Sequence, residues 1–210
     1  MGGGFENQQI GESMFEVRIH GRGGQGVVTA AEMLSIAAFE EGHHAQAFPS
    51  FGSERTGAPV VAFCRISDHE IRLREPIMNP DALIIQDPTL LRQVDVFAGL
   101  KKDGFILINT KNTFEELGLE DYVRDWPANR LCTLAAIDLG LKHVGRPVPN
   151  VPLLAGFAAL SGKLELESVC KAINAKFSGK VAQGNIAAAT EAFNLVLARA
   201  KDLSKEAANA

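Results

Sequence analysis

A glycine-rich turn between a strand and a helix constrains the fold of this chain more than any other stretch. Residues 15–21 begin with alternating apolar and polar side chains, which predicts a strand with one buried face. Apolar residues at helical spacing then predict a helix over about residues 25–41. The intervening turn has four glycines in six residues: Gly21-Arg22-Gly23-Gly24-Gln25-Gly26. Because glycine permits positive φ and close approach to the backbone, the sequence predicts an anion-binding turn at a helix N-terminus.

The spacing of Gly21, Gly23 and Gly26 matches the GxGxxG pattern of dinucleotide-binding folds. That function also needs an acid at the end of the second strand, but the strand predicted over residues 44–48 is followed by proline. A P-loop is excluded because no Lys-Ser or Lys-Thr follows the turn. Two interpretations stay open: a phosphate site in which Arg22 meets the anion, or a turn that serves only tight packing of strand against helix.

Composition places the chain among soluble globular proteins. Hydrophobic residues make up 46% and charged residues 22%, and the net charge of -4 argues against nucleic-acid binding. The sequence shows neither a signal peptide nor a membrane-spanning run. Cys64, Cys132 and Cys170 are widely spaced among apolar neighbours, so we expect buried free thiols and no metal site. The expected location is the cytoplasm.

We expect a single folded domain over residues 14–204, after a disordered leader over residues 1–13 and before a tail over residues 205–210. Strand and helix patterns alternate through the first part of the chain. This order predicts an α/β fold with a mixed, mostly parallel sheet flanked by helices, a Rossmann-like glycine turn after the first strand, and a helical C-terminal part. The helices of that part are expected over about residues 129–142, 151–161, 165–177 and 183–204.

A hairpin is expected in the middle of the chain. Residues 60–66 form an apolar strand pattern that ends in a polar turn over residues 67–70. Ile71 and Leu73 then repeat the alternation, which predicts an antiparallel partner for that strand. A hairpin of this kind makes the sheet mixed.

Two later apolar runs, residues 82–86 and 105–108, are typical of parallel strands that are buried on both faces. Each is followed by polar residues, with Asp87 as a helix N-cap after the first and Asn109 after the second. Ligands of open α/β sheets gather at the carboxyl ends of strands. We therefore expect Asp87 and Asn109 to border the same crevice as the glycine turn.

The polar loop over residues 49–59 is a second candidate segment. It holds charge and hydroxyl groups in Ser53, Glu54, Arg55 and Thr56. Such a loop is commonly just solvated, although functional residues concentrate on loops. The chain lacks GxSxG, HExxH and SxxK motifs, so no self-sufficient catalytic machinery and no catalytic residue is assigned to it.

Four stretches together carry a family resemblance: HGRGGQGVVTAAEML, AFPSFGSERTGAPVVAFCRIS, ALIIQDPTLL and GFILINT. As an ordered set they resemble the gamma subunit of the 2-oxoacid:ferredoxin oxidoreductases, most closely the pyruvate enzyme (pyruvate synthase), over roughly residues 14–195. That family decarboxylates a 2-oxoacid on thiamine diphosphate and sends two electrons through iron-sulfur clusters to ferredoxin. The acyl group passes to coenzyme A. The resemblance implies an oxidoreductase subunit of anaerobic metabolism.

The resemblance also implies a division of labour among subunits. This chain lacks the thiamine diphosphate signature and grouped cysteines, so thiamine diphosphate, Mg and 4Fe-4S clusters are expected on alpha and beta partners. A ferredoxin-like delta subunit is left open. This chain is expected to complete the active site and to help bind coenzyme A. The residues expected at that site are Arg22, Gly23, Gly24, Gln25, Gly26, Ser53, Glu54, Arg55, Thr56 and Asn109.

Two functions of other classes stay open at this point. One is a free-standing nucleotide-binding oxidoreductase that uses the GxGxxG turn and would bind NAD without partners. The other is a purely structural subunit whose glycines serve packing and assembly. Within the family, the sequence does not decide between pyruvate and 2-oxoglutarate, and pyruvate is the hypothesis that we favour.

Overall fold

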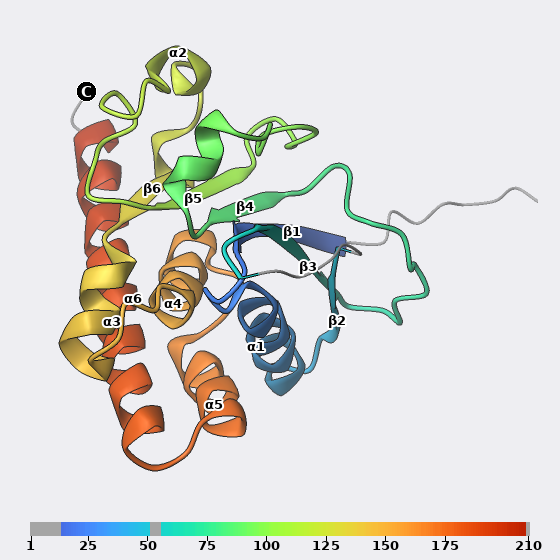
Figure 1. Ribbon diagram of the computed structural model, residues 1–210. Helices are drawn as coiled ribbons and strands as arrows, with labels where there is room; N and C mark the ends of the chain where they lie inside the picture. Colours follow the sequence, from blue (N-terminus) through green and yellow to red (C-terminus); the bar gives the residue numbers. More distant parts are fainter. Residues whose placement is uncertain (1–13, 51–55, 209–210) are drawn as a thin grey trace, which may run out of the picture.

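A computed structural model describes residues 14–50 and 56–208, so the leader over residues 1–13 lies outside the described residues. The strands form one sheet in the order β2-β3-β1-β4-β5-β6 (Figure 1). This sheet confirms the predicted α/β class. The strands are β1 (Met14–Arg22), β2 (His44–Pro49), β3 (Pro59–Ser67), β4 (Ala82–Ile85), β5 (Phe105–Asn109) and β6 (Leu131–Leu134).

Strand β1 lies inside the sheet and marks the point where its pairing changes. On one side β1 pairs antiparallel with β3, from Met14 opposite Ser67 to Arg22 opposite Pro59. On the other side β1 pairs parallel with β4, and the pairs β4–β5 and β5–β6 are parallel too. The sheet is therefore mixed and mostly parallel, as predicted. The glycine turn follows β1 at this change of direction, the kind of place where α/β sheets bind ligands.

The predicted hairpin after β3 is wrong, although the sheet is mixed for another reason. Residues 71–74 form no strand. β3 already pairs with β2 along one edge and with β1 along the other, so no edge remains for a returning strand. The alternation of Ile71 and Leu73 instead belongs to an irregular segment in which Leu73 is exposed.

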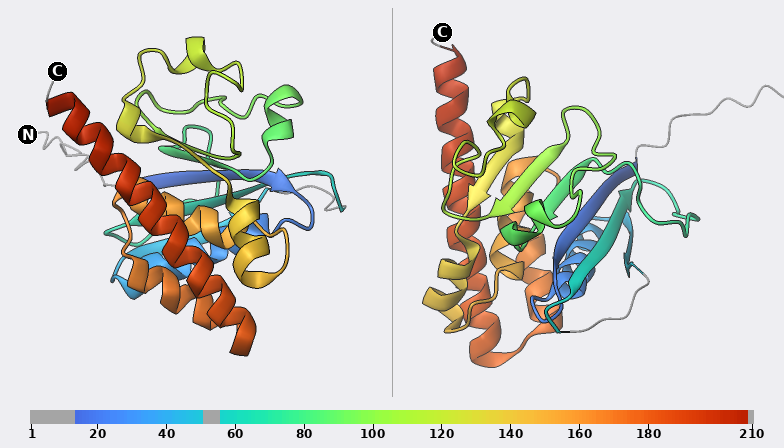
Figure 2. Two further views of the ribbon diagram at one scale, coloured as in Figure 1. Left: turned by 90° about the vertical axis from the view of Figure 1, so that its left-hand side faces the viewer. Right: turned by 45° about the horizontal axis from the view of Figure 1, so that its top comes forward.

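The longer helices cover one face of the sheet, with α4 innermost and α6 outside it (Figures 1 and 2). α4 is apolar all round because it packs against the sheet, α1 and α6, and Phe157 within it is fully buried. The helices of this layer are α1 (Val27–Glu40), α3 (Ala136–Val144), α4 (Asn150–Ser161), α5 (Leu166–Lys176) and α6 (Gly179–Ala208).

Shorter elements cover the opposite face of the parallel strands. They are the 3-10 helix η1 (Pro88–Arg92) and the short helix α2 (Glu120–Val123), whereas the 3-10 helix η2 (Ala128–Arg130) contacts α4 and α6 of the first layer. Ile85, Ile106 and Ile108 of the sheet pack here against Leu90 and Val96. Strands β4 and β5 are thus buried on both faces, which explains their unbroken apolar sequences. Among the described residues, no helix is both long and apolar enough to cross a membrane.

The C-terminal part contains one strand that the sequence did not predict. The helix expected over residues 129–142 is in fact η2, then β6, and only then α3. Four residues, Leu131 to Leu134, extend the sheet by pairing parallel with β5. α4 and α5 lie close to their expected ranges, whereas α6 begins before residue 183 and continues to Ala208, into the expected tail.

Candidate functional site

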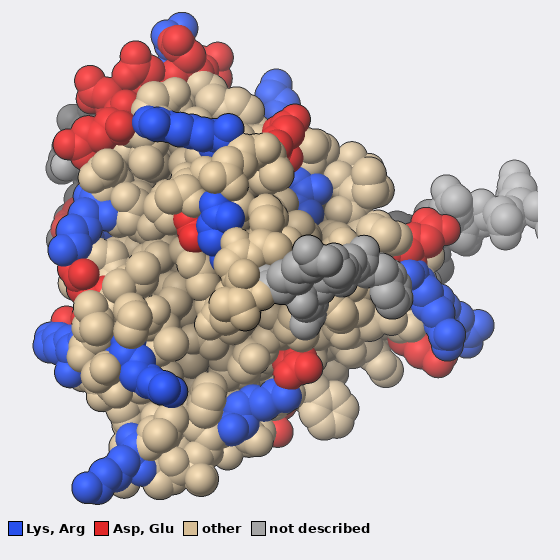
Figure 3. Space-filling view, viewed as in Figure 1, with Lys and Arg blue, Asp and Glu red and all other residues tan. Residues whose placement is uncertain are grey.

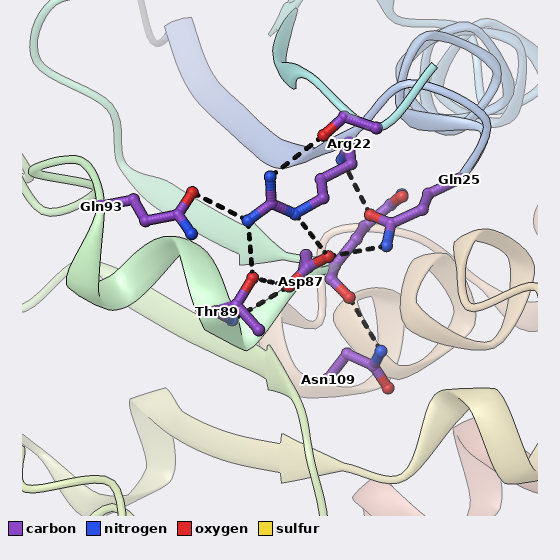
Figure 4. A network of polar contacts seen from close by, with 8 residues as sticks. Arg22, Gln25, Asp87, Thr89, Gln93 and Asn109 are labelled. Carbon is purple, nitrogen blue, oxygen red and sulfur yellow. Dashed lines mark hydrogen bonds and ion pairs between the residues drawn. The ribbon is translucent and has the colours of Figure 1, made fainter.

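The glycine turn lies at the carboxyl ends of β1 and β4, where helix α1 begins (Figure 4). Gly26 is the N-cap of α1 and has φ 73° and ψ 34°, in the left-handed region. The first turn of a helix leaves backbone N–H groups without intrahelical partners and carries the positive end of the helix dipole. The predicted strand-turn-helix unit is therefore present, and its helix N-terminus points toward this edge of the sheet.

The glycines of the turn differ in the space around them. A Cβ on Gly21 would lie 2.6 Å from Cγ2 of Val27, so close packing of strand and helix requires glycine there. Gly24 has φ 95° and is exposed, and apart from its chain neighbours no atom of the described residues lies within 4 Å of a Cβ position. The turn therefore combines tight packing at one end with an open, exposed apex. The packing at Gly21 agrees with the packing interpretation, and the anion site stays a prediction.

Arg22 joins the turn to the segment after β4. Its Nε donates to Oδ2 of Asp87 at 3.1 Å, and its Nη2 donates to Oγ1 of Thr89 and Oε1 of Gln93, both at 2.8 Å (Figure 4). Nη1 donates to the carbonyl of Gly57 at 3.0 Å. Most of the guanidinium donors thus have protein acceptors. Arg22 acts here first as a link between segments, and an incoming anion would share it with these groups.

The Asp87 carboxylate is the acceptor at the centre of this network. Its Oδ2 accepts from Arg22 and also from Nε2 of Gln25 at 2.9 Å, while Oδ1 accepts from the backbone N–H of Thr89 at 3.0 Å. Partial burial alone would raise the pKa of Asp87. The hydrogen bonds from Thr89 and Gln25 and the charge of Arg22 outweigh burial and hold that pKa below its usual value. As predicted, Asp87 is the N-cap of the following helix, although that helix is the 3-10 helix η1.

Asn109 lies beside this network, as expected for residues at adjacent strand ends. Its Nδ2 donates to the carbonyl of Gln86 at 2.8 Å, and its Oδ1 accepts from the N–H of Ala136 at 3.1 Å and of Ile137 at 3.4 Å. The side chain is buried, with 4% exposure. Asn109 therefore ties the end of β4 to the beginning of α3, and its amide is already engaged by the protein.

Gln86, between β4 and Asp87, is a buried polar residue that the sequence did not single out. Its exposure is 0%, and neither Oε1 nor Nε2 has a hydrogen-bond partner among the described residues. A Cβ on Gly21 would lie 3.2 Å from Cβ of Gln86, so the glutamine lies directly beside the turn. An unpaired buried amide costs stability, so Gln86 is an unusual residue in the packing beside the turn.

The polar loop before β3 meets the turn through its described end. Thr56 is exposed and forms a parallel bridge with Gly23. The N–H of Gly23 donates to the carbonyl of Ala58 at 2.9 Å, and the N–H of Gly57 donates to the carbonyl of Gly23 at 3.1 Å. The structure thus brings Thr56 to the predicted site. Ser53, Glu54 and Arg55 lie outside the described residues.

Four residues of the site were not predicted from the sequence: Gln86, Thr89, Gln93 and Asn150. Asn150 begins α4, and its Nδ2 would lie 2.5 Å from a Cβ on Gly26. The tripeptide Gln86-Asp87-Pro88 after an apolar run was a signal for a polar strand tip. Thr89 lies two residues after Asp87, at a position whose backbone N–H commonly donates to an Asp N-cap. The contacts of Gln93 and Asn150 arise only from the tertiary fold.

The arrangement is suited to binding rather than to bond making. The network around the turn pairs a cation with a carboxylate and amides, and the Asp87 pKa is shifted away from the range in which a general base operates. Among the described residues, no three His, Cys, Asp or Glu side chains come together as metal ligands. On the face seen in Figure 3, charged side chains lie mainly around the rim, and acidic ones gather over α2.

Comparison with known proteins agrees with the motif resemblance. The sequence pattern of the pyruvate ferredoxin/flavodoxin oxidoreductase family matches residues 16–195. The common gamma subunit of the pyruvate/ketoisovalerate oxidoreductases of Thermococcus kodakarensis is 47% identical over 86% of this chain and 96% of its own length. Pyruvate synthase subunit PorC of Methanothermobacter marburgensis is 45% identical, with the same shares covered.

A solved structure gives the same assignment. The crystal structure of pyruvate oxidoreductase subunit PORC from Thermotoga maritima is 36% identical and superposes with a TM-score of 0.72, covering 86% of this chain and 96% of that one. The family match spans most of the chain, including the glycine turn, the Asp87 network and most of α6. The chain therefore belongs to the pyruvate ferredoxin/flavodoxin oxidoreductase family, where it falls among the gamma subunits.

Proposed function

We propose that this chain completes the coenzyme A site of an enzyme that oxidatively decarboxylates pyruvate to acetyl-CoA and CO₂ and reduces ferredoxin. The turn residues Gly23, Gly24, Gln25 and Gly26 form the surface that meets the coenzyme. Arg22 and Thr56 border that surface, and Ser53, Glu54 and Arg55 belong to the adjoining loop. Asn109 supports this surface indirectly, because its side chain fixes the end of β4.

The observation that carries this proposal is the exposed apex of the turn at Gly24. Coenzyme A carries phosphate groups, and the beginning of α1 offers it free backbone N–H groups and the positive end of a helix dipole. Among the described residues, no atom outside Gly24 and its two chain neighbours lies within 4 Å of a Cβ position on Gly24, so a ligand can approach the backbone there. The unpaired amide of Gln86 beside the turn adds buried polar groups to the same place.

Arg22 supplies the positive charge of the site. Its side chain is 22% exposed, so the guanidinium is reachable from solvent even while it pairs with Asp87. Thr89 and Gln93 are neutral acceptors, and a phosphate forms stronger, charge-assisted hydrogen bonds than they do. We propose that a coenzyme phosphate shares the guanidinium with Asp87 by replacing these neutral contacts.

Partner subunits supply the remaining chemistry. We propose alpha and beta subunits that hold thiamine diphosphate, Mg and 4Fe-4S clusters, and ferredoxin as electron acceptor, with a ferredoxin-like delta subunit as a further partner. The thiols Cys64, Cys132 and Cys170 are free, which suits a reducing cytoplasm, and no cluster is assigned to them. Thiamine diphosphate, held by the partners, would supply the decarboxylation chemistry, and this chain would bind and orient coenzyme A as the acyl acceptor.

Pyruvate is the proposed substrate, and the choice between 2-oxoacids is proposed to lie with the partners. The Thermococcus kodakarensis relative is named as a common subunit of pyruvate and ketoisovalerate oxidoreductases. A subunit that serves two enzymes does not distinguish their 2-oxoacids by the side chain. 2-Oxoglutarate and ketoisovalerate are therefore the substrates to compare with pyruvate in the assembled complex.

The test is Gly24→Asp in the complex of this chain with its partners, assayed by viologen reduction with pyruvate and varied coenzyme A. We expect the KM for coenzyme A to rise about tenfold or more, because a carboxylate at the apex repels phosphate. Gly24→Asn is the matched control. It has the same size and the same backbone strain at φ 95° but no charge, so it should raise KM less.

The competing function is a purely structural subunit, and the internal pairing of Arg22 favours it. An unchanged KM for coenzyme A in an assembled Gly24→Asp complex would reject the coenzyme site and leave the structural function. Assembly is checked by size-exclusion chromatography and iron content. The free-standing nucleotide-binding alternative predicts NAD binding by the isolated chain, which calorimetry measures directly.

A further inference from the structure

We propose that Asp87 is a positioning residue for the coenzyme A step: its carboxylate fixes the orientation of the glycine turn by binding both Arg22 and Gln25. The inference rests on the proposed contact between the turn and the coenzyme. Asp87 itself is not assigned a contact with the ligand. Its role is to set where the backbone of Gly23 and Gly24 lies relative to the sheet.

The contacts form a closed ring. The backbone N–H of Arg22 donates to Oε1 of Gln25 at 2.8 Å, and Nε2 of the same glutamine donates to Oδ2 of Asp87 at 2.9 Å. The ring closes because Nε of Arg22 donates to the same oxygen at 3.1 Å. The residues before and after Gly23 and Gly24 are thus bound to one oxygen atom. The peptide groups between them have little freedom to turn.

Asp87 is itself held by the sheet and by η1. It follows β4, whose residues Ala82 to Ile85 are fully buried between β1 and β5. Its second oxygen, Oδ1, accepts from the N–H and from Oγ1 of Thr89, at 3.0 and 2.5 Å. The carboxylate therefore has a fixed position, and it transmits that position to a turn whose glycines would otherwise be flexible.

All of these bonds are donated to Asp87, which is why a carboxylate is required. An asparagine at this position has one acceptor oxygen and one NH₂ group. In any orientation, its NH₂ group faces either the donors Arg22 and Gln25 or the N–H of Thr89. Asp87→Asn therefore breaks the ring or the N-cap while conserving the shape of the side chain, and it removes the charge that pairs with Arg22.

The chain contains a matched control at the other end of the same strand. Asp81 precedes β4 as Asp87 follows it. Oδ2 of Asp81 accepts from the N–H of Glu16 at 2.8 Å, and Oδ1 pairs with Nζ of Lys101 at 2.9 Å. Each carboxylate thus accepts a hydrogen bond from a backbone N–H and pairs with a cation. Asp81, however, lies at the amino end of β4, away from the turn. Asp81→Asn removes a comparable interaction without touching the turn.

The experiment compares Asp87→Asn, Asp81→Asn and Gly24→Asp in complexes assembled with the partner subunits. For Asp87→Asn we expect the KM for coenzyme A to rise about tenfold while the KM for pyruvate stays within about twofold, because only the coenzyme surface has moved. Asp81→Asn should leave both constants within about twofold of wild type. Size-exclusion chromatography and thermal unfolding confirm equal assembly and compare the loss of stability in the two asparagine variants.

A double variant tests whether the effect passes through Gln25. If it does, Asp87→Asn combined with Gln25→Ala should cost little more than either change alone, because both open the same ring. Additive losses would overturn the positioning role. An unchanged KM for coenzyme A in Asp87→Asn would also overturn it, and a raised KM in Gly24→Asp would then leave the coenzyme site intact. A raised KM in Asp87→Asn with no change in Gly24→Asp would reject both proposals.

Discussion

Gly26 and Asn150, from the first and the fourth helix, are packed so closely that a Cβ on the glycine would lie 2.5 Å from Nδ2 of the asparagine. The contact joins the beginning of α1 to the beginning of α4, the innermost helix of its layer. Two helix N-termini therefore meet at the carboxyl edge of the sheet. The glycine turn is thus part of the packing of the domain as well as the candidate ligand surface.

Gly26→Ala should destabilise the isolated chain more than Gly24→Ala. Both positions have positive φ, 73° and 95°, so both substitutions carry a strain of about 1–2 kcal/mol. At Gly26 the new methyl group also displaces Asn150, whereas at Gly24 it meets open space. Urea unfolding measures the two free energies. Equal losses would show that Asn150 moves aside without cost.

Asn109→Ala should lower the free energy of unfolding by about 2–3 kcal/mol, because it removes a buried side chain that serves three backbone groups. The carbonyl of Gln86 and the N–H groups of Ala136 and Ile137 would lose their partner. Asn112→Ala is the control, since Asn112 is exposed and should change stability by no more than about 0.5 kcal/mol. A loss below 1 kcal/mol at Asn109 would contradict the role given to its amide.

Much of this fold was predictable because local patterns decided it. β4 and β5 are short apolar runs bounded by polar tips, and their pattern is enough to place them in a parallel sheet. The glycine turn was predictable for the same reason, since its neighbours in sequence are a strand and a helix. Asp87 as an N-cap also follows from its neighbour Pro88.

The errors arose where pairing partners decide the structure. Residues Leu131 to Leu134 are a strand because β5 offers them an edge, and a run of three apolar residues and one threonine does not by itself distinguish strand from helix. Ile71 and Leu73 have a strand pattern but find both edges of β3 occupied. Gln93 belongs to the site because it accepts a hydrogen bond from Arg22, 71 positions earlier in the sequence. No local sequence pattern predicts such a contact.

The three thiols should react with a thiol reagent in the order of their exposure. Cys170 is half-buried, whereas Cys64 and Cys132 are buried in the core. Burial raises the pKa of all three thiols, so each reacts slowly at neutral pH, and access then sets the order. Cys170 should therefore label first, and Cys170→Ser should remove this first phase of labelling of the isolated chain. Cys64→Ser should leave that phase intact, and the opposite result would contradict the packing described for the core.

The stability of the chain should fall as the pH drops from 7.5 to 5, because His20 is buried in its neutral form. His20 is 6% exposed, and its Nε2 accepts from Nε of Arg18 at 3.0 Å. Burial, and next the charge of Arg18, lower the pKa of His20 from 6.5 to about 4. Between these values the unfolded chain binds a proton that the folded chain does not. The stabilisation is therefore complete above pH 6.5 and is lost as the pH falls toward 4.

His20→Gln isolates this contribution. Glutamine keeps an oxygen that can accept from Arg18 but does not titrate. Urea unfolding of the wild-type chain at pH 7.5 and pH 5 should show a loss of about 2 kcal/mol that the variant lacks. The measured quantity is the difference between wild type and variant in how far the free energy of unfolding falls. Contributions from other titrating groups are the same in both chains and cancel. A variant that keeps the full pH dependence would show that His20 gains its proton without cost in the folded chain, contrary to its burial beside Arg18.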